Sequence, residues 1–179
     1  MRKLKITELK RLSPDEFKQA EKLPVIVVLD NVRSLHNVGS VFRTSDAFLI
    51  EAIYLCGITA TPPNVEIHKT ALGSENTIEW HYFENTPDAI RQLKQNNYRI
   101  LAVEQAENSI SLDKFKPENY RYAIILGNEV KGIDQLVMDQ CDLSIEIPQL
   151  GTKHSLNVSV AAGIVLWEVF KTHPACRLE

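Results

Sequence analysis

The sequence predicts an α/β protein with a mostly parallel sheet flanked by helices. Short apolar runs rich in β-branched residues, such as Val25–Leu29, alternate with segments whose apolar residues recur at helical spacing. Such runs are typical of strands buried on both faces, and those strands occur in parallel sheets. The chain has 179 residues, of which 44% are hydrophobic and 24% charged, so it is large enough for one domain with its own core.

The first predicted element is a short helix over about residues 14–22, which Ser13 caps and Pro24 ends. The predicted strands share runs of apolar residues, and they are 25–29, 52–55, 100–103, 123–126 and 143–147. The predicted helices share helical spacing, and they are 37–49, 87–97, 134–140 and 155–172. The polar stretch 105–120 is expected to be a loop. Ligands of such sheets bind beyond the carboxyl ends of the strands, so we expect the chemistry in the loops there.

The last predicted helix is apolar on nearly every side. Its apolar residues are Leu156, Val158, Val160, Ala161, Ala162, Ile164, Val165, Leu166, Trp167, Val169 and Phe170. A helix that is apolar all round is buried all round. We expect a second copy of the chain to cover part of this helix, which gives a homodimer. The alternative is a central helix in the core of a monomer.

Composition and motif counts exclude several classes of protein. The longest apolar run, Val25–Leu29, is far shorter than the roughly 20 residues that a membrane-spanning helix needs, and no apolar signal region follows the N-terminus. Cys56, Cys141 and Cys176 are widely separated, which indicates free structural thiols in a reducing cytoplasm. The five histidines show no ligand spacing, so we expect no metal.

The net charge of −3 argues against a general affinity for nucleic acid, but the charge is unevenly distributed. The first twelve residues carry a single acid, Glu8, and a cluster of bases, which are Arg2, Lys3, Lys5, Lys10 and Arg11. This segment is either a basic arm that binds RNA or a terminal segment that is merely solvated.

The first of three polar segments, residues 31–44, follows a predicted strand and opens a helix. Asn37 and Gly39 suit a tight turn there. Arg43, near the start of the helix, could hold a phosphate through two parallel hydrogen bonds. Considered alone, an arginine at this position is more often an ordinary surface charge.

The second segment, residues 125–133, places Gly127 and Gly132 around an Asn-Glu pair at the end of a strand. Glycine there lets backbone groups approach a ligand closely. The spacing matches neither the dinucleotide-binding fingerprint nor a P-loop, and a plain strand-to-helix turn is the alternative.

The third segment, residues 147–161, is a loop that runs into the last helix. Ser155 is well placed to cap that helix. Asn157 lies just inside an apolar element, and a buried amide without partners costs about 1–3 kcal/mol. We therefore expect a ligand or another loop to satisfy Asn157.

Together, the three segments resemble the signature motifs of the SpoU (TrmH-like) branch of the SPOUT RNA methyltransferases. N-x-G-x-x-x-R at 37–43, L-G-N-E-x-x-G at 126–132 and I-P-x-x-G-x-x-x-S-L-N-V-S-V-A at 147–161 match in order and spacing, and residues 69–73 are similar to another family segment. The resemblance covers about residues 24–172. It implies an α/β fold whose C-terminal segment forms a deep trefoil knot.

The resemblance implies transfer of a methyl group from S-adenosyl-L-methionine to a ribose 2′-hydroxyl in tRNA or rRNA, by a dimer. The residues that match the family's catalytic positions are Arg43, Asn37, Glu129, Ser155 and Asn157. Those that match or flank its cofactor-binding positions are Leu126, Gly127, Asn128, Gly132, Ile147 and Leu156. The residues that we expect at the RNA are Arg2, Lys3, Lys5, Lys10, Arg11 and Arg33.

We divide the chain into a basic N-terminal extension with a short helix, 1–23, and a SpoU-type methyltransferase domain, 24–179. Because an arginine loses its proton only above about pH 12, Arg43 is expected to position a phosphate and stabilise an alkoxide, with proton removal left open. The sequence departs from the family pattern at residues 34–36 and at Leu49, so the substrate side could differ. The alternative function is a catalytically inactive, knotted RNA-binding or ribosome-assembly factor.

Overall fold

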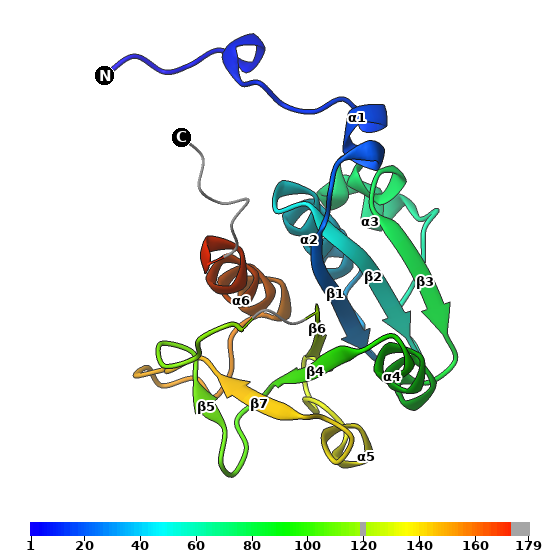
Figure 1. Ribbon diagram of the computed structural model, residues 1–179, viewed down its shortest axis with the longest axis vertical. Coiled ribbons are helices and arrows are strands. Elements are labelled where there is room, and N and C mark those ends of the chain that lie inside the picture. Colours follow the sequence, from blue (N-terminus) through cyan, green and yellow to red (C-terminus); the bar gives the residue numbers. More distant parts are fainter. Residues whose placement is uncertain (119–120, 173–179) are drawn as a thin grey trace.

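A seven-stranded, all-parallel sheet forms the centre of the protein, in the order β3-β2-β1-β6-β4-β7-β5 (Figure 1). The computed structural model describes residues 1–118 and 121–172, so the predicted end of the domain, with Cys176, lies outside the described residues. The strands are β1 (Leu23–Asp30), β2 (Ile50–Cys56), β3 (Glu79–Phe83), β4 (Tyr98–Val103), β5 (Ile110–Ser111), β6 (Arg121–Leu126) and β7 (Leu143–Glu146).

Helices connect most of the strands and cover both faces of the sheet. They are α1 (Pro14–Gln19), α2 (Leu35–Ala47), α3 (Val65–Ala71), α4 (Thr86–Gln95), α5 (Gln135–Met138) and α6 (Val158–Thr172), with 3-10 turns η1 (Ile6–Glu8) and η2 (Ser74–Asn76). The helices α2, α3 and α6 share one core with the sheet, and α4 and α5 share a second core on the opposite face. The result is three layers, with the sheet in the middle.

The central strands are buried on both faces, as their apolar runs predict. In β1, Val27 packs in the core with α2 and α6, and the next residue, Val28, packs in the core with α4. Because successive side chains of a strand point to opposite faces, a strand between two helical layers needs an uninterrupted apolar run. The predicted α/β class and all five predicted strands are therefore confirmed.

Several predicted boundaries differ from the structure. Ser13 caps helix α1 as predicted, in a capping box with Glu16, but the helix ends at Gln19. Strand β3 and helix α3 were not predicted, and the short strand β5 lies inside the stretch predicted to be a loop. The side chain of Phe17 on α1 is buried in the main core, so this part of the N-terminal extension packs on the sheet domain.

The helix α6 is apolar, but a single chain does not bury it all round. Val158, Ala162 and Val165 are buried against the sheet and α2. On the other side, Val160 and Trp167 are each 51% exposed. An apolar strip of α6 therefore remains on the surface of one chain, which does not fit the alternative of a central helix in a monomer; the second copy expected to cover the strip stays a prediction.

Within the described ranges, no helix has the length and apolar character needed to span a membrane. In the same part of the chain, no three His, Cys, Asp or Glu side chains gather as they would around a metal ion. Cys56 and Cys141 are free, and burial raises the pKa of each thiol to about 12. Such thiols are protonated and unreactive at neutral pH, which agrees with a structural role.

Candidate active site

The first motif lies within helix α2, which begins directly after β1. The Ser34 hydroxyl caps α2 by accepting the backbone N–H of Asn37 at 3.3 Å. Asn37 and Gly39 are therefore helical residues, and the tight turn predicted for them is wrong. Because this cap starts the helix at Leu35, Arg43 lies in the third turn and not near the helix start.

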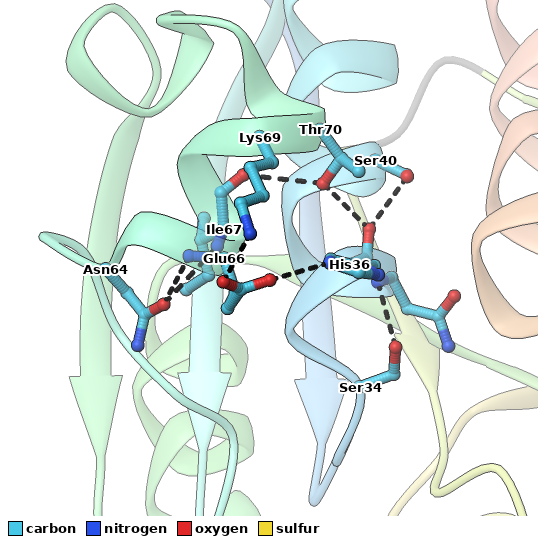
Figure 2. Close-up of polar contacts among 9 residues, drawn as sticks. Ser34, His36, Ser40, Asn64, Glu66, Ile67, Lys69 and Thr70 are labelled. Carbon is cyan, nitrogen blue, oxygen red and sulfur yellow. Dashed lines mark hydrogen bonds and ion pairs between the residues drawn. The ribbon is translucent and has the colours of Figure 1, made fainter.

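Gly39 is required by the packing of α2 on α3. A Cβ atom at this position would lie 2.2 Å from Thr70 Oγ1 and 2.3 Å from the Ile67 carbonyl oxygen. Figure 2 shows the contacts that join the two helices at the same place. Thr70 Oγ1 donates to the His36 carbonyl at 3.0 Å, and His36 Nε2 lies 3.0 Å from a Glu66 carboxylate oxygen. These contacts hold the first turns of α2, which carry Asn37.

The second motif forms a tight loop at the carboxyl end of β6. Asn128 and Gly132 exchange two backbone hydrogen bonds, of 3.0 and 2.9 Å, and Gly132 has a φ of 69°. The Asn128 side chain donates to the Asn31 carbonyl at 2.8 Å and accepts the N–H groups of Val130 and Lys131. The Asn128 amide is therefore committed to folding the loop and anchoring it to β1.

The Glu129 carboxylate points from this loop to the start of α2. It accepts the backbone N–H groups of Arg33 at 3.0 Å and Ser34 at 2.9 Å, and the side-chain amide of Asn37 at 3.0 Å. Burial raises the pKa of Glu129, but hydrogen bonds lower it by more than burial raises it. The donors are the backbone N–H groups of Arg33, Ser34 and Glu129 itself and the side-chain amide of Asn37. The net pKa lies below the ordinary value, so Glu129 is ionised at neutral pH.

The third motif joins the same hydrogen-bond chain through Asn157. Its amide nitrogen donates to Asn37 Oδ1 at 3.0 Å, and its oxygen accepts the N–H of Ser159 at 2.9 Å. Asn157 thus caps α6, and the prediction that Ser155 is the cap is wrong. Asn157 is also exposed, not buried, and another motif satisfies its amide. We call the chain Glu129–Asn37–Asn157 the motif relay.

Beside the motif relay, the carboxyl ends of β4, β6 and β7 surround a cleft of about 910 Å³. Its lining includes every residue predicted to bind a cofactor, namely Leu126, Gly127, Asn128, Gly132, Ile147 and Leu156. Glu129 and Ser155 line it as well. A volume of this size suits a ligand such as a nucleoside.

The chemistry of the lining also suits a nucleoside. Ile133, Met138 and Ile145 provide apolar contacts for a flat base. Gly127 lets the end of β6 lie directly against the loop, because a Cβ atom there would be 2.4 Å from the carbonyl carbon of Gly132. Backbone groups at strand ends are then available for hydrogen bonds, so the residues present fit an adenosine-containing cofactor.

Arg43 does not join this group. Its side chain is exposed on α2 and does not line the cleft of its own chain. Among the described residues, it makes no hydrogen bond or ion pair with another side chain. Arg33 contributes its backbone N–H to Glu129, while its side chain is exposed.

The basic residues of the N-terminal segment are exposed, and the segment extends away from the sheet beyond α1 (Figure 1). Arg2 makes a two-point ion pair with Glu8, at 2.7 and 3.0 Å, so one of the cations of this segment is neutralised locally. Lys3, Lys5, Lys10 and Arg11 remain exposed.

Sequence analysis missed two residues of the cleft, Glu104 and Gln105, which directly follow β4. The Glu104 carboxylate accepts the N–H of Ile133 at 3.1 Å, in the second motif. The Gln105 amide donates to the His154 carbonyl at 2.7 Å, in the third motif. An acid directly after a buried strand is a usable signal, but the polar sequence beyond it predicts only a loop.

Residues 24–167 match the model of the SpoU rRNA Methylase family. The chain belongs to the SpoU family. A TrmH-family protein from Staphylococcus saprophyticus is 33% identical over 157 residues, covering 86% of this chain and 61% of that one. The 23S rRNA (guanosine-2′-O-)-methyltransferase RlmB from Nitrosomonas europaea is 32% identical over 172 residues, covering 94% and 65%.

A solved structure, the AdoMet-bound rRNA methyltransferase from Sinorhizobium meliloti, has a TM-score of 0.79 and 28% identity. The match covers 94% of this chain and 62% of that one. The SpoU fold is therefore confirmed, and the C-terminal knot is expected of it. This SpoU chain spans less than two thirds of the length of the relatives described here.

Proposed function

We propose that this SpoU protein transfers a methyl group from S-adenosyl-L-methionine to a ribose 2′-hydroxyl in tRNA or rRNA. The observation that carries the proposal is the motif relay, which joins three distant sequence motifs at the edge of a nucleoside-sized cleft. The names of the RlmB relative and of the AdoMet-bound neighbour support the same reaction.

In this proposal the cofactor lies in the cleft, held by Leu126, Gly127, Gly132, Ile147 and Leu156 through backbone groups and apolar contacts. When bound, it supplies a methyl group made electrophilic by a sulfonium sulfur. Asn128 supports the site by folding the loop. Its side-chain hydrogen bonds are used within the protein, so it acts as a positioning residue.

A ribose hydroxyl is a poor nucleophile, so a site that methylates it would need a group that stabilises the 2′ oxygen as negative charge develops there. Arg43 is assigned to bind an RNA phosphate and to stabilise negative charge on the 2′ oxygen, because a guanidinium stays protonated at neutral pH. Glu129 holds Asn37 in place, and Asn37 holds Asn157. Ser155, exposed on the cleft, is assigned to contact the ribose.

A homodimer would place Arg43 at the cleft of a second chain. Arg43 lies outside its own cleft, on a helix that packs beside α6, where Gly163 faces Thr44. The apolar strip of Val160 and Trp167 on α6 offers a surface for a second copy. Covering this strip removes apolar surface from water, and twofold symmetry would then provide two equivalent sites.

The RNA is expected to contact cations outside the cleft as well. We assign this role to Arg33 and to the basic N-terminal residues Arg2, Lys3, Lys5, Lys10 and Arg11, which are exposed. The division into an extension, 1–23, and a domain, 24–179, remains a prediction. An RNA substrate and the free thiols Cys56 and Cys141 support a cytoplasmic location.

The test is methyl transfer from tritiated S-adenosyl-L-methionine to total RNA from a strain that lacks this gene. A 2′-O-methylated ribose cannot attack the neighbouring phosphodiester, so the label should survive in alkali-resistant dinucleotides. Label released by alkali as mononucleotides would contradict ribose methylation. Binding of cofactor and RNA without methyl transfer would favour the alternative, an inactive RNA-binding or assembly factor.

A further inference from the structure

Glu104 is a carboxylate in the cleft to which none of the three motifs assigns a role. It follows β4, whose neighbours in the sheet are β6 and β7. Its backbone N–H donates to the Ile145 carbonyl at 3.0 Å, and its carbonyl accepts the Ser144 hydroxyl at 3.0 Å. The residue is therefore fixed at the centre of the cleft floor, between the strands that lead to the second and third motifs.

The carboxylate group itself is also held in one orientation. One oxygen accepts the N–H of Gln105 at 3.0 Å, and the other accepts the N–H of Ile133 at 3.1 Å. Gly132 is needed for this arrangement, because a Cβ atom there would lie 2.3 Å from the Glu104 oxygen. The loop of the second motif and the Glu104 side chain thus fit each other closely.

Glu104 still has hydrogen-bonding capacity that the protein does not use. A carboxylate has about four acceptor sites, and the two backbone donors occupy two of them. Within the described residues, no Lys, Arg or His makes an ion pair with Glu104. A half-buried carboxylate that lines a cleft without a cationic partner is suited to accept hydrogen bonds from a ligand.

We propose that Glu104 binds the cis-hydroxyls of the cofactor's ribose. Ile133 donates its backbone N–H to Glu104, while its own side chain belongs to the apolar lining suited to the adenine base. The carboxylate therefore lies next to the nucleoside end of the cleft. A carboxylate at a strand end accepts hydrogen bonds from a ribose in other nucleotide-binding α/β sheets. The proposal rests on cofactor binding as stated under the proposed function.

The proposal is tested by calorimetric titration of the full chain with S-adenosylhomocysteine and with its 2′-deoxy and 3′-deoxy analogues. The wild-type chain should bind each deoxy analogue about tenfold or more weakly, as expected when a hydrogen bond to a charged acceptor is lost. Glu104→Gln should bind S-adenosylhomocysteine about tenfold more weakly and discriminate less than about threefold against the analogues. A purely structural role for Glu104 would leave that discrimination unchanged.

Glu107→Gln is the matched control, because Glu107 is exposed on the same cleft and has no hydrogen-bond partner among the described residues. It should bind all three ligands as the wild type does. Equal binding of the analogues to the wild-type chain would overturn the proposal even if Glu104→Gln failed to fold. Full discrimination by Glu104→Gln would overturn it too.

A further ligand separates the ribose from the amino-acid end of the cofactor. 5′-Methylthioadenosine retains the two hydroxyls and lacks the ammonium group, so Glu104→Gln should weaken its binding about as much as that of S-adenosylhomocysteine. An effect confined to S-adenosylhomocysteine would show that Glu104 binds the ammonium group and that the proposal is wrong. If the wild-type chain binds none of these ligands, the proposed function itself fails, whereas binding without discrimination refutes this inference alone.

Discussion

Both polar atoms of the Asn37 side-chain amide make hydrogen bonds. Its nitrogen donates to Glu129, and its oxygen accepts from Asn157. Neither Asp nor Leu could make both contacts, because a carboxylate has no donor at neutral pH and an alkyl group has no polar atom. An amide at this position in α2 is therefore what allows the second and third motifs to be joined through the first.

Arg43 offers the sharpest test at the residue scale. Arg43→Ala should lose most methyl transfer and keep its melting temperature and its affinity for S-adenosylhomocysteine. The reason is that this exposed side chain has no partner among the described residues and does not line its own cleft. Single-turnover kinetics, calorimetry and thermal unfolding provide the measurements. A parallel loss of cofactor affinity would contradict the role given to Arg43.

Glu129 should make stability depend on pH in a defined direction. Its folded pKa lies below the ordinary value of 4.5, so the ionised carboxylate stabilises the fold. That contribution is complete above the unfolded pKa and is lost as the pH falls through the folded pKa. The free energy of unfolding, from urea titrations, should therefore differ more between wild type and Glu129→Gln at pH 7 than at pH 3.

Glu107→Gln is again the control for Glu129→Gln, since the exposed Glu107 has no hydrogen-bond partner in the described part of the chain. Its difference from wild type should be small at both pH values. A Glu129→Gln difference that is the same at pH 7 and pH 3 would mean that the motif relay does not depend on the charge of Glu129.

At the scale of elements, alanine should have opposite effects at two helical glycines, because Gly39 lies where α2 packs closely on α3 and Gly163 lies in a more open part of α6. Gly39→Ala should destabilise the fold by about 1–3 kcal/mol, because the new Cβ would overlap Thr70 and the Ile67 carbonyl. Gly163→Ala in α6 should be neutral or stabilise by up to about 1 kcal/mol, because among the described residues its Cβ would meet only Thr44 Cγ2, at 3.9 Å.

Urea unfolding of the two variants measures this difference. Alanine favours a helix over glycine at both positions, so helix propensity alone predicts the same sign for both. Equal stabilisation of both variants would show that α2 and α3 are not packed as closely at Gly39 as described here.

The sequence predicted the elements whose signal is apolar burial. Strands β1, β2, β4, β6 and β7 have runs of apolar residues because helices or neighbouring strands cover them. Strand β3 was missed because it forms an edge of the sheet and exposes residues such as Tyr82. Helix α3 is only seven residues long and follows two prolines, so its helical period is too short to recognise.

The candidate site was predictable in its parts but not in its connections. The resemblance to the family motifs identified Asn37, Glu129 and Asn157, but only the fold shows that they bond to one another. The cap of α6 was assigned to Ser155 because serine is a common N-cap, whereas Asn157 performs this role. Glu104 was missed because its partners, such as Ile133, are distant in sequence and bind through backbone atoms.

At the scale of the whole molecule, the exposed strip on α6 predicts a dimer that a single charge can disrupt. Val160→Glu should shift the chain to a monomer in sedimentation equilibrium and reduce methyl transfer. An acid in the first turn is favourable to the helix itself, so α6 should remain folded. Leu136→Glu is the control, because Leu136 is 71% exposed in the first turn of α5 on the opposite face. A Val160→Glu dimer would refute the proposed interface.

We expect the basic N-terminal segment to bind RNA phosphates, and we expect added salt to lower this part of the RNA affinity. Deletion of residues 1–12 should lower RNA affinity and flatten its dependence on salt concentration, because fewer phosphates are neutralised. Affinity for S-adenosylhomocysteine should not change, because this segment does not line the cleft. Filter binding across a salt series provides the measurement. An unaltered slope would mean that these cations are merely solvated.

Asn37 and Asn157 are 120 positions apart in the sequence, yet one hydrogen bond joins them. During synthesis on the ribosome, the early and middle parts of the sheet can form while α6 is still inside the exit tunnel. A nascent chain at that stage contains Arg43 and Glu129 but has no finished third motif. We therefore expect the methyl transfer proposed for this site to begin only once α6 has docked and Asn157 has reached Asn37.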